Sequence, residues 1–162
     1  MEYRIETAKA DDLPRILGIY AYARSFMAQT GNPTQWGTSH PPQAQLEKDI
    51  ENGRLYLVKE GSSIRGVFYF CIEEDPTYAV IHDGSWRDTK SYGVIHRIAA
   101  DGSGGILKAA VDFAKGRIDY LRIDTHEDNR VMQSALQKQG FHYCGIIHIA
   151  DGSPRLAYDL IV

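Results

Sequence analysis

A glycine-rich turn between a predicted strand and a predicted helix is the feature that most constrains the fold of this sequence. Residues 94–99 are dense in β-branched side chains and predict a buried strand. Three glycines among residues 102–105 follow it. Helical spacing then appears in the apolar positions Ile106, Leu107, Ala110, Val111 and Ala114. The chain therefore passes from strand to helix through one tight turn.

A turn of this kind is suited to binding phosphate groups. Its backbone N–H groups can point outward at a helix N-terminus, where the macrodipole adds partial positive charge. Glycine also simply makes tight turns, so a purely structural role is the alternative. No Gly-Lys-Ser/Thr follows as in a P-loop, and the spacing is not that of a dinucleotide-binding turn. Asp101 stands where a nucleophile elbow needs glycine, so Ser103 is not predicted to be a nucleophile.

The remaining elements follow from periodicity and turn signals. Charged and apolar residues alternate from Tyr3 to Thr7, which predicts an N-terminal strand. A helix is expected after it, with Asp11 as its N-cap, and a second helix is expected to end at Asn52-Gly53. A hairpin is expected over 55–72, and a helix capped by Asp128 or Asn129 ends at Gly140. Further strands are expected at 120–123, 141–149 and 155–161. No repeat or linker divides this order, which predicts one α/β domain over residues 1–162.

Composition limits the possible partners. The chain has 162 residues, a net charge of −3 and no apolar stretch near the ~20 residues of a membrane span. The N-terminus lacks the apolar core of a signal peptide, so we expect a soluble, cytoplasmic protein. The charge argues against nucleic acid and anionic membrane and favours a small-molecule or peptide substrate. Cys71 and Cys144 stand apart in apolar runs and are expected to be reduced and buried.

The whole order of elements, from Tyr3 to about Tyr158, resembles the GNAT superfamily of acyl-coenzyme A N-acyltransferases. The strand at 95–99 and the glycine turn after it are similar to the family's coenzyme-binding motif. The stretch 129–141, an Asn-opened helix ending in Gly-Phe, resembles its second motif. Together with residues 124–129 and 151–158, it looks like a subgroup of short bacterial members.

The resemblance implies a twisted, mixed but mostly antiparallel sheet with helices on both faces. Its fourth and fifth strands would splay apart to hold acetyl-coenzyme A, which would donate an acetyl group to an amine; no metal is implied. A homodimer is also expected from the family. The residues implied to contact the coenzyme are Ile98, Ala99, Ala100, Gly102, Ser103, Gly104, Gly105, Ile106, Asn129 and Met132.

Two departures from the family pattern bear on function. The pyrophosphate loop is shortened, so its basic position falls on Gly102 and its last small residue on Leu107. Binding would then rest on backbone amides, with Lys108 and Arg130 as possible helpers. The tyrosine that many members use to protonate the thiolate falls on Leu136. A non-catalytic acyl-coenzyme A-binding or regulatory module is therefore the alternative reading.

The loss of that acid does not preclude catalysis. A thiol has a pKa of roughly 8.5, so a thiolate leaves readily, and general acids contribute only about 10²–10⁴-fold. The amine must also lose a proton, and His96 on the central strand is the predicted base. His126, in an acidic turn, is the rival candidate. Amides near Ile98 and Ala99 are expected to stabilise the developing oxyanion.

Loop residues are the candidates for the acceptor pocket. The turn-rich loop 32–42 is expected to form a substrate lip, and Trp36, Trp86 and Tyr92 lie in loops rather than in periodic core stripes. The alternative is that these aromatic side chains seal an edge of the core. A metal bound by His126 and the acidic residues around it is disfavoured, because adjacent residues in an extended turn rarely converge on one ion.

Overall fold

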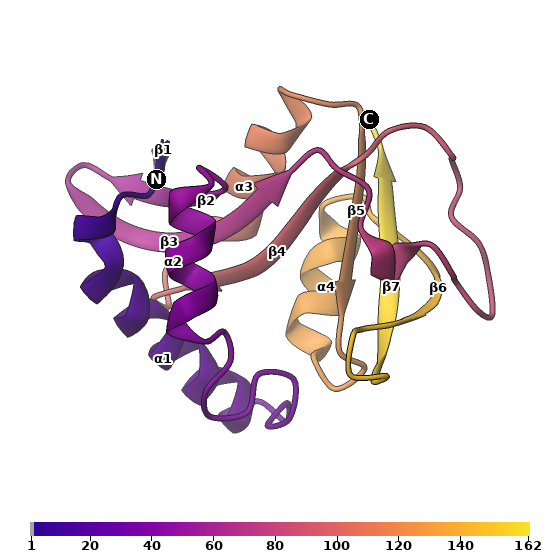
Figure 1. Cartoon of the computed structure of the whole chain (residues 1–162), viewed down its shortest axis with the longest axis horizontal. Helices are drawn as coiled ribbons and strands as arrows, with labels where there is room; N and C mark the ends of the chain where they lie inside the picture. Colours follow the sequence, from indigo (N-terminus) through magenta and orange to yellow (C-terminus); the bar gives the residue numbers. More distant parts are fainter. Residues whose placement is uncertain (1) are drawn as a thin grey trace.

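A seven-stranded mixed sheet runs through the whole protein. The computed structural model describes residues 2–162. The strand order is β1-β2-β3-β4-β5-β7-β6, and every neighbouring pair is antiparallel except β4 and β5 (Figure 1). The strands are β1 Arg4–Thr7, β2 Leu55–Glu60, β3 Ser63–Cys71, β4 Gly93–Ala100, β5 Tyr120–Thr125, β6 His142–His148 and β7 Pro154–Ile161. The mixed, mostly antiparallel sheet that the sequence predicted is confirmed.

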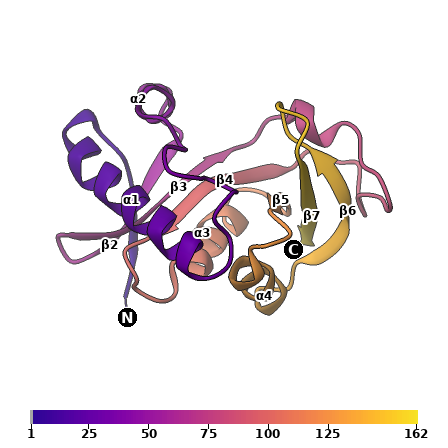
Figure 2. The same ribbon diagram turned by 90° about the horizontal axis from the view of Figure 1, so that it is seen from below.

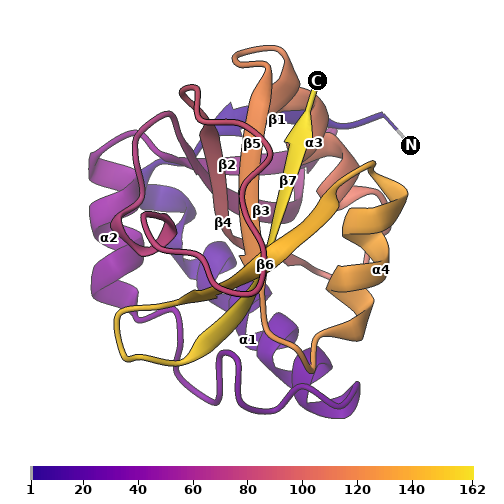
Figure 3. The ribbon, with the colours of Figure 1, turned by 90° about the vertical axis from the view of Figure 1, so that its right-hand side faces the viewer.

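Helices cover both faces of this sheet, as predicted. They are α1 Leu13–Gln29, α2 Gln43–Glu51, α3 Ile106–Lys115 and α4 Arg130–Lys138. Side chains of α1 and α2 pack on one face and those of α3 and α4 on the other, so α2 and α4 lie on opposite sides in Figures 2 and 3. The expected cap at Asp11 was wrong. A short 3-10 turn, Ala10–Asp12, precedes α1, and the Asp12 carboxylate accepts the Lys9 N–H instead.

The two parallel strands separate soon after they meet. Gly93 pairs with Leu121 and Val94 with Arg122, and no further pairs join β4 to β5 in the described chain. Figure 1 shows the two strands together at one end and far apart at the other. Backbone groups beyond Val94 are thus released from the ladder between these strands and can bind a ligand. The predicted splay of the fourth and fifth strands is confirmed.

A β-bulge in β4 changes which side chains face each side of the sheet. Arg97 and Ile98 together oppose the single residue Phe68. Arg97 adopts a left-handed φ of 50°, a conformation that costs a non-glycine residue about 1 kcal/mol or more. The Tyr20 hydroxyl donates a 2.6 Å hydrogen bond to the Arg97 carbonyl and stabilises it. Bulges commonly re-aim side chains beside functional sites.

The bulge determines on which face of the sheet the side chains around it lie. Ile95 packs in the core beneath α3 and α4, so His96 faces the other side. After the extra residue, Ile98 packs toward α3 and α4 again, whereas Ala99 packs under α1. His96 and Arg97 consequently both lie on the side covered by α1 and α2.

A third apolar cluster lies where the chain between β3 and β4 folds over β5, β6 and β7. Tyr78, in the 3-10 turn Pro76–Tyr78, packs there with Tyr92, Tyr120 and Ile147. Cys144 is buried, as expected, while Cys71 is only half-buried, and both are free thiols. None of the helices in residues 2–162 combines the length and the apolarity that a membrane crossing demands.

Candidate active site

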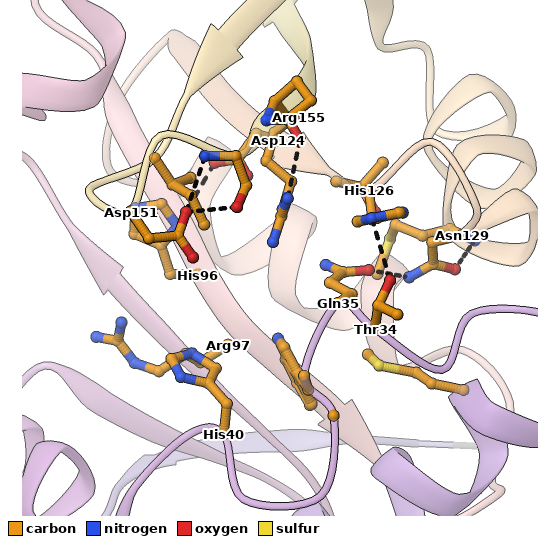
Figure 4. A pocket seen from close by; sticks show the side chains of 18 of the residues that line it. Thr34, Gln35, His40, His96, Arg97, Asp124, His126, Asn129, Asp151 and Arg155 are labelled. Atoms are coloured by element: carbon orange, nitrogen blue, oxygen red, sulfur yellow. Dashed lines mark hydrogen bonds and ion pairs between the residues drawn. The ribbon is translucent and has the colours of Figure 1, made fainter.

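A cleft of about 1010 Å³ opens where β4 and β5 separate. Its floor is the middle of β4 and the end of β5, and the loop after α1 and the turn between β6 and β7 form its rim. The start of α4 closes one side through Asn129 and Met132. Figure 4 shows His96, Arg97, Asp124, His126 and Arg155 around this space. The cleft therefore brings both histidines predicted from the sequence to one cavity.

His96 forms a dyad with an acidic residue of the preceding segment. Its Nε2 lies 2.7 Å from Oδ2 of Asp75, and its side chain is 25% exposed to the cleft. Asp75 is ionised at neutral pH, so Nε2 carries the proton of this hydrogen bond and the lone pair of a neutral ring lies on Nδ1. That atom is 4.0 Å from Oδ2 of Asp124. His96 thus has one nitrogen held and one free to accept a proton.

The Asp75 carboxylate makes the stability of the protein depend on pH. Burial raises the pKa of its carboxyl, but hydrogen bonds from His96 and Thr77 outweigh burial and lower the pKa to about 2. An unfolded aspartate has a pKa near 3.9. The stabilisation is therefore complete above about pH 4 and is lost as the pH falls toward 2, because the unfolded chain binds the proton first.

We expect Asp75→Asn to remove this dependence. Between pH 5 and pH 2 the wild type should lose about 2 kcal/mol more unfolding free energy than the variant. Urea unfolding followed by tyrosine and tryptophan fluorescence at several pH values measures it. If the unfolding free energies of the two proteins fell in parallel with pH, Asp75 would not be the source of this pH dependence.

His126 lies at the same cleft, but both its nitrogens are engaged. Nδ1 accepts the backbone N–H of Asp128 at 3.0 Å. The ring proton of the neutral form therefore sits on Nε2, which lies 3.4 Å from the Thr34 hydroxyl. The basic lone pair of His126 is thus occupied within the turn. This geometry favours His96 over His126 as the proton acceptor.

The predicted lip loop is tied to the far side of the cleft by a chain of amides. Gln35 Oε1 accepts hydrogen bonds from Nδ2 of Asn129, at 3.0 Å, and from Nδ2 of Asn32, at 2.9 Å. Asn129 also caps α4, because its Oδ1 accepts the Met132 N–H. The structure thus gives Asn129 two structural roles, and its contact with the coenzyme stays a prediction.

The three aromatic residues expected in the acceptor pocket fall in different places. Trp36 lines the cleft and packs edge-on against Tyr20, with ring centroids 5.6 Å apart. Trp86 and Tyr92 do not line it. They pack in the third apolar cluster, where the Arg122 guanidinium stacks over both rings. The position of these residues in loops did not show which of them line the cleft and which pack over the core.

The glycine turn lies at the C-terminal end of β4, outside the cleft lining. The Asp101 carboxylate accepts the Ser103 N–H at 3.0 Å, so that amide is already used. Gly102 and Gly105 have φ values of 102° and 81°, which favour glycine. Gly104 and Gly105 border a separate hollow of about 700 Å³ on the β1 side, beside Lys108, whose ammonium pairs with Asp112.

The other predicted coenzyme contacts are distributed along the same strand and turn. Ile98 lines the cleft, while Ala99 is buried beneath α1 and Ala100 ends the strand half-buried. Ile106 is buried in the core, so its side chain is not free to contact a coenzyme. Leu136, at the family's tyrosine position, is fully buried. Arg130 is exposed at the start of α4.

Several cleft residues were missed by sequence reasoning. Asp75, Asp124, Arg97 and Arg155 line it, as does His40 on the lip loop. Their positions follow from strand register, the bulge and the path of the segment after β3, none of which leaves a spacing pattern in the chain. Only the polar character of the lip loop could have pointed to His40.

Solved structures with the same arrangement identify the fold. An acetyltransferase of the GNAT family from Streptococcus agalactiae matches with a TM-score of 0.88 and 29% identity, over 99% of this chain and 95% of that one. The chain has the fold of the GNAT acetyltransferases. A GNAT-family acetyltransferase from Listeria monocytogenes matches with a TM-score of 0.72 and 18% identity, over 100% and 96% of the two chains.

The GNAT fold is shared with structures of more distant sequence. A ribosomal-protein-alanine N-acetyltransferase from Brucella melitensis matches with a TM-score of 0.63 and 18% identity, over 98% of this chain and 99% of that one. No family model matches the sequence. No curated protein matches it either. The GNAT fold of this chain is therefore established by structural similarity, and the cleft is the feature that bears on the acceptor.

Proposed function

We propose that this GNAT protein transfers the acetyl group of acetyl-coenzyme A to a primary amine of a small molecule or peptide. The observation that carries the proposal is the position of the His96–Asp75 dyad. It lies beside the β4 bulge, where the two central strands separate. A proton acceptor and freed backbone amides thus meet at one place, which amide formation requires.

The residues around the strand gap suit a coenzyme arm. Thr125 is 1% exposed, lines the cleft, and its Oγ1 has no hydrogen-bond partner within residues 2–162. A buried hydroxyl without a partner is costly, so a ligand amide beside it would be stabilising. Ile98 and Met132 supply apolar contacts in the same wall. When bound, acetyl-coenzyme A supplies the acetyl group as a thioester.

The turn before α3 suits the diphosphate. Within residues 2–162, the amides of Gly104, Gly105 and Ile106 donate to no protein acceptor. These amides lie at a helix N-terminus, where an anion is favoured. Asp101 does not oppose this with a free charge, since Arg15 and Arg65 pair with its carboxylate at 3.2 and 3.3 Å.

The side chains of the cleft can prepare the amine. Asp124 Oδ2 accepts the Tyr78 hydroxyl at 2.7 Å and lies 4.0 Å from His96 Nδ1. A protonated amine between them can donate to both and pass its proton to Nδ1. Asp75 then stabilises the positive ring. The amide N–C bond forms as the thioester C–S bond breaks, and the electron pair leaves on sulfur. The second proton lost by the nitrogen goes to this thiolate, which leaves as the free thiol.

The test is release of free thiol from acetyl-coenzyme A in the presence of an amine panel, with the acetylated product confirmed by mass. We expect acceptor-dependent release. Binding of acetyl-coenzyme A without turnover across the panel would favour the non-catalytic module, for which the buried Leu136 in place of the family's tyrosine is the supporting observation. No binding at all would refute both.

Gly104→Val is expected to weaken acetyl-coenzyme A binding at least about tenfold, a loss of about 1.4 kcal/mol. A Cβ at Gly104 meets nothing within 4 Å, so the side chain enters the space assigned to the diphosphate without disturbing the fold. Calorimetric titration measures the affinity. Gly18→Val is the matched control, because a Cβ on this exposed helical glycine also meets nothing within 4 Å. Unchanged affinity at Gly104 would place the diphosphate elsewhere.

A further inference from the structure

Arg155 is a buried cation that faces the cleft and has no salt-bridge partner in residues 2–162. It is 7% exposed and lines the cleft from the start of β7. Its Nη1 donates one 2.8 Å hydrogen bond, to the Pro154 carbonyl oxygen. No carboxylate in residues 2–162 lies within salt-bridge distance of it. Most donors of its guanidinium are therefore left for a ligand.

The other arginines around the cleft and core are compensated. Arg97 pairs with Asp49 at 2.9 Å, and Arg87 pairs with Asp159 at 2.6 Å. Arg122 is as buried as Arg155, but it donates to the Asp88 carbonyl and stacks over aromatic rings. A buried charge without a partner is unfavourable, so retention of an uncompensated arginine in a cleft points to a ligand anion.

Positive charges act on His40 at this part of the cleft. Partial burial lowers the pKa of His40, and the nearby charges that lower it further are those of Arg97, Arg155 and Arg24. Figure 4 shows the Arg155 side chain directed into the cleft, with Arg97 and His40 on the opposite rim. The corner therefore repels cations and attracts an anion.

Acidic groups of the lining form no ion pair with Arg155 in residues 2–162. The Asp151 carboxylate is held by the N–H and hydroxyl of Ser153, and these bonds, with a smaller contribution from Arg155, lower its pKa. Asp75 is paired with His96, and Asp124 accepts the Tyr78 hydroxyl. Glu127 is exposed in the turn after β5. Asp75 and Asp124 instead make the end at His96 attractive to an ammonium group.

The sheet separates this corner from the coenzyme's turn. Arg155 alternates along β7 with Leu156, which packs toward α3 and α4, so Arg155 lies on the opposite face with Ala157. The glycine turn opens α3, on the other face. A phosphate at that turn and an anion at Arg155 are thus different groups.

We propose that the acceptor amine carries a carboxylate, and that Arg155 binds it while Asp124 and His96 receive the amino group. This inference rests on the proposed transferase function and adds the chemical class of its acceptor. A guanidinium presents paired donors that match the two oxygens of a carboxylate, so the cleft selects amino acids and similar amino carboxylates over neutral amines.

The experiment compares matched acceptors. A panel of α- and ω-amino acids, each beside its own carboxamide, is assayed by thiol release with wild type, Arg155→Gln, Arg155→Lys and the control Arg4→Gln. Arg4 lies on the edge strand β1 and is largely exposed, so the control removes the same charge away from the cleft. We expect the wild type to prefer an acid over its amide. Arg155→Gln should lower kcat/KM for that acid at least about 30-fold and leave the amide almost unchanged.

Arg155→Lys should keep part of the preference, and Arg4→Gln all of it. Binding of N-acetylated amino acids and of their amides, measured by calorimetry without coenzyme, provides a second readout. Acid-selective binding that Arg155→Gln abolishes supports the subsite even where no amine turns over, and the transferase proposal then fails alone. Turnover that ignores the carboxylate, or an acid-to-amide ratio unchanged in Arg155→Gln, overturns the subsite and leaves the transferase standing. Absence of both turnover and acid-selective binding overturns the carboxylate subsite as well.

Discussion

His96→Gln is expected to lower kcat for acetyl transfer by about 10²–10⁴-fold at neutral pH. Glutamine can still donate a hydrogen bond to Asp75, so the wall of the cleft is preserved, but it has no lone pair that accepts a proton near neutrality. Affinity for acetyl-coenzyme A should change less than about twofold, because His96 faces the side of the sheet opposite α3. Steady-state thiol release and calorimetric titration measure the two quantities.

The pH profile separates a lost base from a damaged site. At alkaline pH the acceptor amine loses its proton in solution, so the defect of His96→Gln should shrink as the pH rises toward 10. His126→Gln is the matched control. Its ring is engaged by the Asp128 amide and the Thr34 hydroxyl, so we expect a much smaller fall in kcat. A profile of His96→Gln parallel to that of the wild type, or a larger defect in His126→Gln, would reassign the base.

Local patterns were enough to predict the order of elements and the layer structure. Helical spacing at residues 106–114 and the glycine turn before them gave α3 its correct place, and the Asn129 cap and Gly140 stop gave α4 its limits. Those features depend on neighbours in the chain. They are fixed by backbone preferences and by apolar faces that a sequence displays directly.

The cleft depends on contacts between distant segments, and much of it escaped prediction. Asp75 meets His96 only because the chain after β3 folds back over β5 and β7. The bulge at Arg97 has no proline or glycine to announce it, since the strain is compensated by Tyr20 and Asp49 from α1 and α2. Spacing along the chain cannot show such compensation.

The aromatic residues illustrate the same limit. Trp36 and Trp86 both stand in polar loops, and the sequence gives no reason to separate them. Trp36 reaches the cleft because its loop crosses to α4 through Gln35. Trp86 is turned inward because its Nε1 donates to the Tyr78 carbonyl and Arg122 stacks on its ring. Contacts with distant segments of the chain decide which side chains of a loop are exposed to solvent.

Asp159→Ala is expected to reduce the free energy of unfolding by about 3–5 kcal/mol. The Asp159 side chain is fully buried and accepts hydrogen bonds from Arg87 Nε at 2.6 Å, the Arg87 N–H at 3.0 Å and the Tyr120 hydroxyl at 2.8 Å. Alanine removes the counter-charge of the Arg87 guanidinium and leaves the Arg87 N–H without an acceptor, while the Tyr120 hydroxyl keeps the Asp88 carbonyl. Urea unfolding measures the loss, and Asp159→Asn, which still accepts hydrogen bonds, should lose less.

A control variant and a pH series test whether the loss in Asp159→Ala comes from its buried charge. Glu73→Ala breaks an ion pair with Arg54 at a side chain that is 58% exposed, and should cost less than about 1 kcal/mol. Burial raises the pKa of Asp159, but hydrogen bonds from Arg87 and Tyr120 outweigh it and lower the pKa below its ordinary value. The stabilisation is therefore present above about pH 4 and lost in stronger acid. Wild type and Asp159→Ala should converge there, and a gap that stays constant down to pH 2 would show that the loss comes from packing rather than from charge.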